Sequence, residues 1–292
     1  MLAKNLLEKI GFTEEMKNEY KRYKTLLQDR MCDCVLRYMS GELQYNELVE
    51  ELKAFETEEI HQHTVHLMFI LECTGILEKR YEEDGIPSEV FVQTMKDITC
   101  KVQECFDVKG IFGTFVLRWY DLFFRMKVFA LGRLQYEPKI HSGDDIVLKD
   151  YVIRDGDFIL NCHIPGTGPL RHSDCVESYR MAYEFFKGKF RDGILPIYCS
   201  SWLLFPPYQK AFEVSANITD FAKDFEIFNR STQGGFWDAW RVFGMDYKND
   251  TSVLPTKTSL QRAFVEYLKE NSDYGEGKGF ILFDGKNILT SR

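Results

Sequence analysis

The sequence predicts an α/β protein of the α+β type, with a helical N-terminal domain (residues 1–127) followed by a mixed α/β domain (residues 128–292). Two observations support this prediction. Apolar residues recur every three or four positions through the first part, which is the period of an amphipathic helix. From residue 131 onward, β-favouring segments alternate with glycine turns, which is typical of strands. Each part is long enough to form its own core.

In the helical part, Pro87 and Ser88 mark the start of a helix, because proline is favoured in a first turn. Apolar residues then recur at helical spacing and define one face of this helix. They are Phe91, Met95, Ile98, Val102 and Cys105. We expect that face to be buried.

The second part is expected to form strands at residues 131–137, 146–153, 157–164, 194–201 and 279–283, and helices near 173–187 and 258–270. Asp155 and Gly156 predict a hairpin turn between the second and third of these strands. Thr258 and Gln261 match a capping box at the start of the last helix.

Composition and charge exclude several classes of protein. A formal net charge of -8 argues against a general nucleic-acid-binding role, which needs clustered Lys and Arg. With 45% hydrophobic and 28% charged residues, the chain has the balance of a soluble globular protein. Charged residues interrupt every apolar stretch, and the 8 cysteines are scattered, so we expect reduced thiols, a cytoplasmic location and no membrane association.

Residues 155–186 form the strongest candidate for a ligand site. A strand that ends at His163 leads through a glycine turn into a helix near Ser173. Such a corner aims backbone N–H groups and the positive end of the helix at one spot, which favours an anion. Since the two prolines of the turn carry no N–H, the expected donors are Gly166, Thr167, Gly168 and Leu170. A plain structural corner is the alternative interpretation of the same pattern.

Four segments resemble bacterial proteins described as acyltransferase-like, and the resemblance covers nearly the whole chain. They are LGRLQYE at 131–137, HIPGTG at 163–168, SWLL at 201–204 and SLQRA at 259–263. In the proteins that the chain resembles, a helical domain precedes a GNAT-like domain, whose mixed and mainly antiparallel sheet is flanked by helices. The resemblance therefore implies an acyltransferase that uses acyl-coenzyme A, with acetyl-CoA as the expected co-substrate and a small-molecule amine as the acceptor.

The GNAT-like resemblance also implies a pyrophosphate site. In that superfamily the acyl-CoA loop reads Gln or Arg, two residues, Gly, one residue, then Gly or Ala, between a strand and a helix. HIPGTG keeps the spacing and both glycines but begins with His163. The resemblance implies that Gly166, Thr167, Gly168 and Leu170 hold the cofactor. The role of His163 stays open, because this residue either holds the loop by a hydrogen bond or takes part in the reaction.

Two residues are candidates for proton transfer. His163 is the first choice as general base, because a histidine side chain titrates near neutral pH. Its alternative role is a hydrogen bond that holds the turn. Tyr208 resembles tyrosines that protonate the leaving thiolate, and its alternative role is packing in the core. In the superfamily the amine attacks the thioester directly, so no covalent intermediate with the enzyme is required.

Further candidates border the same predicted cleft. Ser201 and Trp202 end a strand that should part from strand 157–164 to admit the pantetheine arm, although Trp202 could instead fill a core. Arg133, Gln135 and Glu137 alternate along a predicted strand and therefore share one face. They are candidates for the substrate-pocket wall, and a solvent-facing surface is the alternative.

Rival interpretations concern metal binding and loss of activity. His61, His63 and His66 lie on a predicted helix where only His63 and His66 occupy neighbouring positions, so we expect no metal. The serious alternative to an enzyme is a GNAT-like binding or regulatory protein that holds coenzyme A or a related anion without turnover. The sequence predicts no oligomeric state.

Overall fold

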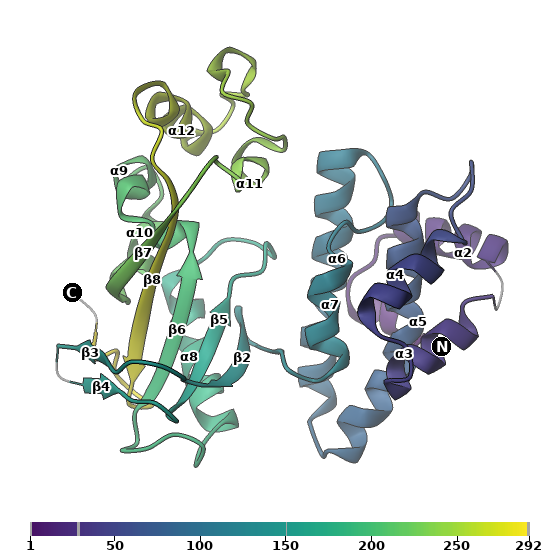
Figure 1. The fold of residues 1–292 in the computed structure, drawn as a ribbon, viewed down its shortest axis with the longest axis horizontal. Helices are drawn as coiled ribbons and strands as arrows, with labels where there is room; N and C mark the ends of the chain where they lie inside the picture. The colour runs from purple at the N-terminus through teal and green to yellow at the C-terminus, as the bar shows by residue number, and fades with distance from the viewer. Residues whose placement is uncertain (1, 28–29, 150, 291–292) are drawn as a thin grey trace. The chain divides into compact units, whose positions relative to one another are not determined.

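The computed structural model describes residues 2–27, 30–149 and 151–290, and Figure 1 shows its helices and strands. The chain divides into two compact units. One comprises Met1–Ala130 with Pro165–Thr167, and the other comprises Leu131–Ile164 with Gly168–Arg292. The predicted fold class, a helical region and then a mixed sheet flanked by helices, is confirmed.

Helices make up the described part of the first unit as far as Phe124, and strand β1 (Phe129–Leu131) begins at its end. The helices are α1 (Leu6–Lys9), α2 (Glu14–Leu27), α3 (Cys32–Ser40), α4 (Tyr45–Lys53), α5 (Gln62–Glu83), α6 (Ser88–Lys109) and α7 (Leu117–Phe124). Helix α5 is central, because α2, α3, α4, α6 and α7 all pack against it. The predicted start of α6 at Ser88 is confirmed, and so is its buried face of Phe91, Met95, Ile98, Val102 and Cys105.

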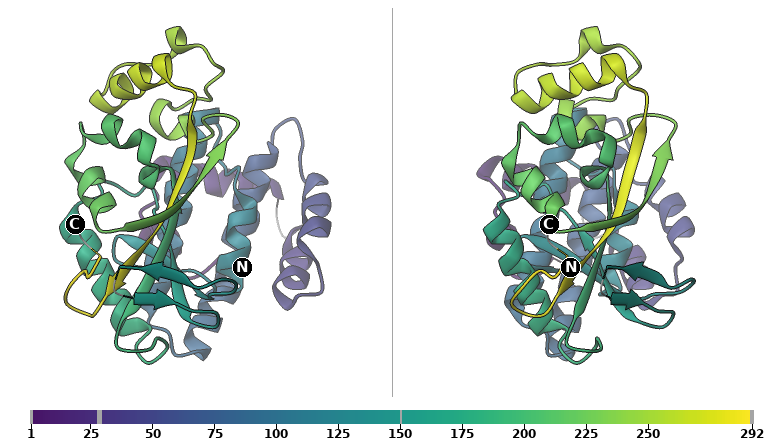
Figure 2. Two further views of the ribbon diagram at one scale, coloured as in Figure 1. Left: turned by 60° about the vertical axis from the view of Figure 1, so that its left-hand side comes forward. Right: turned by 90° about the vertical axis from the view of Figure 1, so that its left-hand side faces the viewer.

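The second unit is organised around a six-stranded sheet with the order β1-β2-β5-β6-β8-β7. Its strands are β1 (Phe129–Leu131), β2 (Leu134–Ile140), β5 (Phe158–His163), β6 (Leu195–Ser201), β7 (Glu226–Gln233) and β8 (Tyr274–Phe283). Strands β5 and β6 pair in parallel, whereas β2–β5, β6–β8 and β7–β8 pair antiparallel. Both views in Figure 2 show β7 and β8 as a long pair at one edge of the sheet.

Helices and a small second sheet cover the two faces of this sheet. Helix α8 (His172–Phe185) packs on one face, where Ser178 Oγ lies 2.9 Å from the Tyr136 hydroxyl of β2. On the other face, β3 (Ile146–Leu148) and β4 (Tyr151–Ile153) form a hairpin whose Leu148 and Ile153 join the core cluster with Ile159. The remaining helices are α9 (Gln209–Phe212), α10 (Ala216–Lys223), α11 (Ala239–Phe243) and α12 (Ser259–Glu270), with short 3-10 turns at Trp202–Leu204, Pro206–Tyr208 and Thr251–Val253.

The capping box predicted for the last helix is confirmed. The Gln261 backbone N–H donates to Thr258 Oγ1 at 3.1 Å, and the Thr258 N–H donates to Gln261 Oε1 at 3.1 Å. These two bonds satisfy donors that a helix start otherwise leaves unpaired. Helix α12 accordingly begins at Ser259.

Three strand predictions were wrong. Residues 131–137 are not one strand, because Gly132 has a φ of +73° and turns the chain between β1 and β2. The segment predicted as one strand at 146–153 instead contains two strands, Ile146–Leu148 and Tyr151–Ile153, which pair antiparallel. The turn at Asp155 and Gly156 does not join two paired strands, because β4 pairs with β3 while β5 pairs with β2.

Strand β8 is longer than the predicted segment 279–283, and it carries an unusual glycine face. A Cβ at Gly275 would lie 2.0 Å from the carbonyl oxygen of Ser231, and one at Gly277 would lie 2.0 Å from the carbonyl oxygen of Leu204. Neither position has room for any side chain. The glycines alternate with Glu276 along the strand, so this carboxylate must lie on the opposite face.

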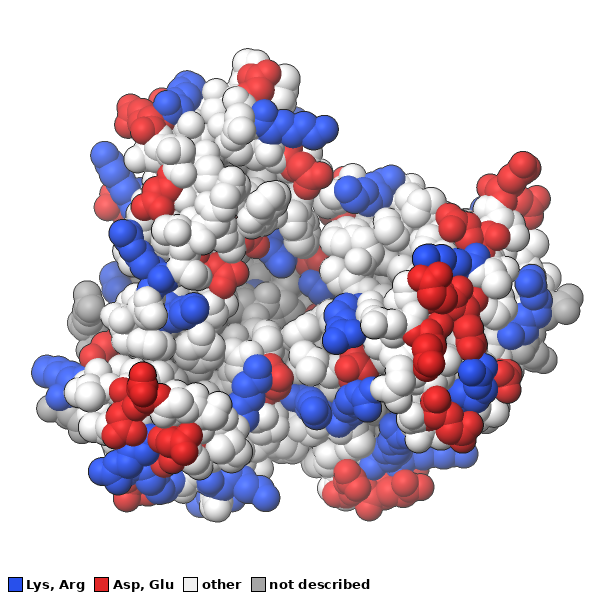
Figure 3. Space-filling model, viewed as in Figure 1, with Lys and Arg blue, Asp and Glu red and all other residues white. Residues whose placement is uncertain are grey.

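The surface mixes charges of both signs. Figure 3 shows one face on which Lys and Arg side chains lie close to Asp and Glu side chains. Among the described helices, none combines the length and the apolar character needed to span a lipid bilayer.

Candidate active site

Four polar side chains share one face of the sheet where β2 and β5 pair. The antiparallel register places Gln135 opposite His163 and Glu137 opposite Asn161. Because side chains alternate along a strand, all four point to the side away from α8. The predicted substrate residues Gln135 and Glu137 and the predicted base His163 therefore come together, and Asn161 joins them.

Glu137 lies at the centre of these contacts. Its Oε2 atom accepts hydrogen bonds from Asn161 Nδ2 at 3.0 Å and His163 Nε2 at 3.2 Å, and it forms an ion pair with Lys139 Nζ at 3.1 Å. We call the set of Glu137, Asn161, His163 and Lys139 the Glu137 cluster. The side chain of Glu137 is 9% exposed and that of His163 is 25% exposed, so the histidine is the more accessible of the two.

The environment of Glu137 fixes its charge. Burial alone would raise its pKa, but hydrogen bonds from His163, Asn161 and Lys139 together outweigh burial and lower the pKa to about 2. Glu137 is therefore a carboxylate throughout the physiological range. Since a carboxylate can only accept, a hydrogen bond between Glu137 and His163 requires a proton on Nε2, and Asn161 Nδ2, which also lies 3.3 Å from Nε2, then donates to Glu137 alone.

Strands β5 and β6 pair over a short stretch only. Their parallel register joins Leu160 with Ile197 and Asn161 with Tyr198, although β5 continues to His163 and β6 to Ser201. Beyond these two pairs, the strands no longer share a registered ladder. The parting begins beside Asn161, within the Glu137 cluster.

The glycine turn follows directly after β5. Among the residues that the structure describes, none accepts a hydrogen bond from the backbone N–H groups of Gly166, Thr167, Gly168 or Leu170. Gly168 has a φ of +124°, which L side chains rarely adopt. Helix α8 begins at His172, so these donors precede the positive end of a helix.

Arg133 has a different place from the one predicted. It lies in the turn between β1 and β2, so the expected strand face shared with Gln135 and Glu137 is wrong for this residue. Its Nε donates to the carbonyl oxygen of Pro169 at 3.1 Å, and a terminal nitrogen donates to that of Gly168 at 2.8 Å. Arg133 therefore binds carbonyl groups of the glycine turn and adds a positive charge beside it.

The remaining predicted residues lie along and after β6. Ser201 Oγ accepts from the Leu203 N–H at 3.2 Å, and the Trp202 ring packs against Phe264 and Phe236. Tyr208 is 1% exposed, and burial raises the pKa of its hydroxyl. Its hydroxyl accepts weakly from the Gly275 N–H at 3.4 Å. Its predicted role as proton donor stays a prediction.

Sequence reasoning missed three polar residues on this face. Asn161 had a visible signal, because it is the one amide side chain in a strand that otherwise reads apolar up to His163. Ser200 Oγ donates to Glu276 Oε2 at 2.7 Å, a contact that joins β6 to β8. No local sequence pattern points to these two residues, because their contact depends on the register of the two strands.

Other candidate groups do not build a comparable site. The prediction that only His63 and His66 are neighbours is wrong, because His61 caps α5 and its ring centre lies 4.6 Å from that of His63, against 6.2 Å between His63 and His66. The described residues contain no group of three or more His, Cys, Asp or Glu arranged to hold a metal ion. Burial raises the pKa of the Cys162 thiol well above its usual range, which disfavours a thiolate nucleophile.

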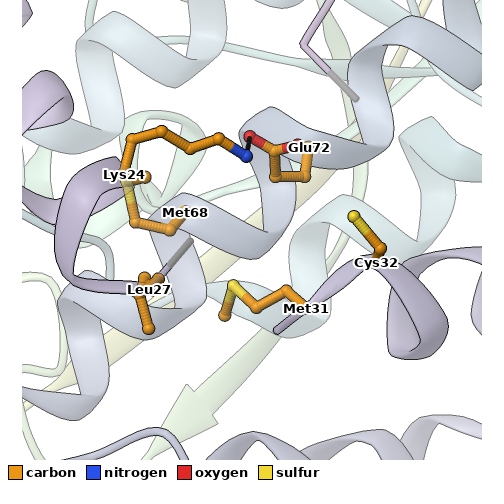
Figure 4. A pocket seen from close by; sticks show the side chains of 6 residues that line it. All are labelled: Lys24, Leu27, Met31, Cys32, Met68 and Glu72. Atoms are coloured by element: carbon orange, nitrogen blue, oxygen red, sulfur yellow. Dashed lines mark hydrogen bonds and ion pairs between the residues drawn. The ribbon is translucent and has the colours of Figure 1, made fainter. Parts of the chain in front are cut away.

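A small pocket lies in the helical unit (Figure 4). It is lined by Lys24, Leu27, Met31, Cys32, Met68 and Glu72. Lys24 Nζ and Glu72 Oε1 form an ion pair of 3.0 Å at its edge. None of the residues predicted for ligand binding lines this pocket.

Two family models match the chain. A model described as a GNAT-like C-terminal domain matches residues 128–281, and one described as an N-acyltransferase N-terminal domain matches residues 1–126. The search of curated proteins returned no match.

Solved structures resemble nearly the whole chain. An acyltransferase in complex with decanoyl-CoA and teicoplanin is 23% identical, with a TM-score of 0.70 over 96% of this chain and 87% of that chain. A mutant acyltransferase in complex with octanoyl-CoA is 23% identical, with a TM-score of 0.69 over 95% and 86%. A further acyltransferase in complex with decanoyl-CoA is 18% identical, with a TM-score of 0.61 over 96% and 99%. At these identities the likeness shows a shared fold.

Proposed function

The chain belongs to the GNAT-like C-terminal domain family, preceded by an N-acyltransferase N-terminal domain, and from this membership we propose that it transfers an acyl group from acyl-CoA to an amine. The observation that carries the proposal is the Glu137 cluster, which lies where β5 and β6 part and directly before a turn whose N–H groups have no acceptor among the described residues. The end of the β5–β6 register beside Asn161, the proposed base His163 and the proposed anion site in the glycine turn therefore follow one another along the chain.

In this proposal the N–H groups of Gly166, Thr167, Gly168 and Leu170 bind the pyrophosphate of coenzyme A. Arg133 holds the turn through its two carbonyl contacts. The parted ends of β5 and β6 admit the pantetheine arm, whose amides pair with the strand backbone. Ser201 and Trp202 lie at the end of β6 and border this opening.

The chemistry is a direct displacement. The amine nitrogen attacks the thioester carbonyl carbon, a C–N bond forms, the C–S bond breaks, and the bonding pair leaves on sulfur. An acceptor that arrives as an ammonium ion first loses one proton to His163, which passes it to solvent. A second proton of the nitrogen reaches the thiolate, and we keep Tyr208 as the predicted carrier. The products are an amide and the free thiol of coenzyme A.

Glu137 positions His163 for this step. The hydrogen bond from Nε2 to Glu137 Oε2 holds the ring in the tautomer whose Nδ1 carries the lone pair, and it fixes the orientation of the ring. The same arrangement occurs where carboxylates orient histidine bases in other enzymes.

Acyl length belongs to the same proposal. Acetyl-CoA was expected from the sequence, but the similar solved structures contain octanoyl-CoA and decanoyl-CoA. We therefore include longer acyl groups among the candidate co-substrates. A cytoplasmic location and a bacterial source remain predictions from the sequence.

Calorimetric titration with coenzyme A tests the cofactor site. Saturable binding is expected, and Gly168→Ala should weaken it roughly tenfold, because a strained turn misdirects charge-assisted hydrogen bonds. Gly156→Ala is the matched control, since Gly156 also has a positive φ (+85°) and open space around its Cβ position. No binding at millimolar coenzyme A would reject the cofactor site.

Thiol release separates turnover from the alternative of binding without catalysis. The assay uses acetyl-, octanoyl- and decanoyl-CoA with a panel of primary amines. Amine-dependent release of coenzyme A supports the enzyme. Binding without release for every pair would favour the non-catalytic alternative, which the replacement of the usual Gln or Arg by His163 also favours.

A further inference from the structure

A second carboxylate lies on the same sheet face as the Glu137 cluster, beyond the parting of β5 and β6. Asn161 is registered with Tyr198 of β6, so Tyr198 and Ser200 point to the face that carries Asn161. Ser200 is registered with Lys278 of β8, and alternation places Glu276 on that face too. Only β6 separates the strand of His163 from the strand of Glu276.

Glu276 is held in place by neutral groups. Its Oε2 accepts from Ser200 Oγ at 2.7 Å, and its Oε1 accepts from Gln233 Nε2 at 3.5 Å. Within the part of the chain that the structure describes, no Lys, Arg or His forms an ion pair with this carboxylate, although Lys278 lies two residues further on the same face. Glu276 is half-buried, and its contacts with Ser200 and Gln233 hold its carboxylate in position.

The field of Glu276 reaches other groups at this end of the sheet. Burial raises the pKa of Asp238, the ion pair with Arg241 opposes this rise, and the negative charge of Glu276 adds to it. Alternation along β8 places the side chain of Glu276 on the face opposite that of the Gly275 and Gly277 positions. Its charge therefore acts on the face that carries His163.

We infer that Glu276 recognises the positively charged amine of the acceptor and holds it across β6 from His163, an inference that rests on the proposed function. Because β5 and β6 part before His163, the two residues lie farther apart than two paired-strand spacings of about 4.8 Å, which leaves room for a thioester carbonyl and an amine nitrogen between them. A carboxylate held only by neutral donors gains a charge-assisted hydrogen bond from an ammonium group. Ser200 keeps the carboxylate oriented while the ammonium binds.

A titration with matched pairs of charged and neutral ligands tests this inference. Ligand-observed NMR measures the binding of hexylammonium against hexanol, and of benzylammonium against benzyl alcohol, with and without saturating coenzyme A. The wild-type protein should bind each ammonium ion roughly tenfold tighter than the alcohol. Glu276→Gln, which keeps an acceptor for Ser200, should remove this difference while leaving the affinity for coenzyme A unchanged.

Glu226→Gln is the matched control. Glu226 lies on β7 and accepts the backbone N–H of Lys149 at 3.0 Å, far along the strand pair from Glu276, so this variant should keep the preference for ammonium ions. Equal binding of ammonium and alcohol by the wild type, or an unchanged preference in Glu276→Gln, overturns the inference. If coenzyme A binds normally while the preference is absent, the proposed function survives and only the role of Glu276 fails.

Discussion

The C-terminal unit holds two pairs of a histidine and a carboxylate that differ in what surrounds the carboxylate. Glu137 receives donors from His163, Asn161 and Lys139, and these lower its pKa to about 2 despite burial. Asp224 lies 2.9 Å from His172 Nε2, yet burial dominates and raises its pKa. The two carboxylates thus differ in the direction of the pKa shift, although each has a histidine partner, and Glu137 is the one with the additional amide and lysine donors.

This difference separates a pair suited to proton transfer from one suited to holding the fold. Around Asp224 the other donor is the buried hydroxyl of Tyr179, at 3.1 Å, and the main-chain oxygen of Asp224 accepts from Thr290. These contacts join α8, the end of α10 and the C-terminal segment. We expect the Asp224 pair to stabilise the unit and the Glu137 pair to act in catalysis.

The largest effect is expected for His163→Gln. If His163 is the general base, kcat/KM for thiol release should fall by about 100-fold to 10000-fold, because a positioned base contributes roughly that much. The stability in urea should change little. His172→Gln, the same substitution in the other pair, should leave kcat/KM within about threefold of wild type. A His163 variant with unaffected turnover would remove this residue from the mechanism.

The next effect concerns stability. Asp224→Ala leaves the buried Tyr179 hydroxyl without its acceptor and should lower the free energy of unfolding by about 2–4 kcal/mol. Urea denaturation followed by circular dichroism measures this change. Asp220→Ala is the control, because its ion pair with Lys223 is exposed and should contribute little. A loss no larger than that of the control would contradict a structural role for the Asp224 pair.

The smallest effect is the pH dependence of stability, and it should have opposite signs in the two pairs. The pKa of Glu137 is lowered from 4.5 to about 2, so its stabilising contribution is present above pH 4.5 and is lost as the pH falls toward 2. The pKa of Asp224 is raised from 3.8, so its ionisation reduces stability as the pH rises above 3.8.

Urea unfolding of wild type, Glu137→Gln and Asp224→Asn between pH 3 and pH 7 measures these signs. The stability advantage of wild type over Glu137→Gln should grow with rising pH, whereas its advantage over Asp224→Asn should shrink. Parallel curves for the two variants would show that the carboxylates do not differ as described.

The sequence predicted those parts of the fold that depend on local pattern. The buried face of α6 follows from residues three or four positions apart, and the start of α12 follows from Thr258 and Gln261. It did not predict β7, because this edge strand is mostly exposed and reads as polar. It also joined the wrong strands at Gly156, since pairing partners lie far away in the chain.

The candidate site was predictable to a similar degree. His163, Gln135 and Glu137 were named from the sequence, and the structure brings them together. The contact between Glu137 and His163 depends on the register of β2 against β5, which no local pattern contains. Arg133 was assigned to the wrong strand position because Gly132 turns the chain just before it.

The glycine face of β8 affects how variation among relatives should be interpreted. Gly275 and Gly277 lie against backbone oxygens, so even alanine at either position would require the strand or its neighbours to move. In a comparison of relatives both positions should therefore be invariant for steric reasons alone, without contacting any substrate. Selection at Glu276 between them would be a separate matter, and a saturation-mutagenesis profile of this strand would distinguish steric constraint from ligand recognition position by position.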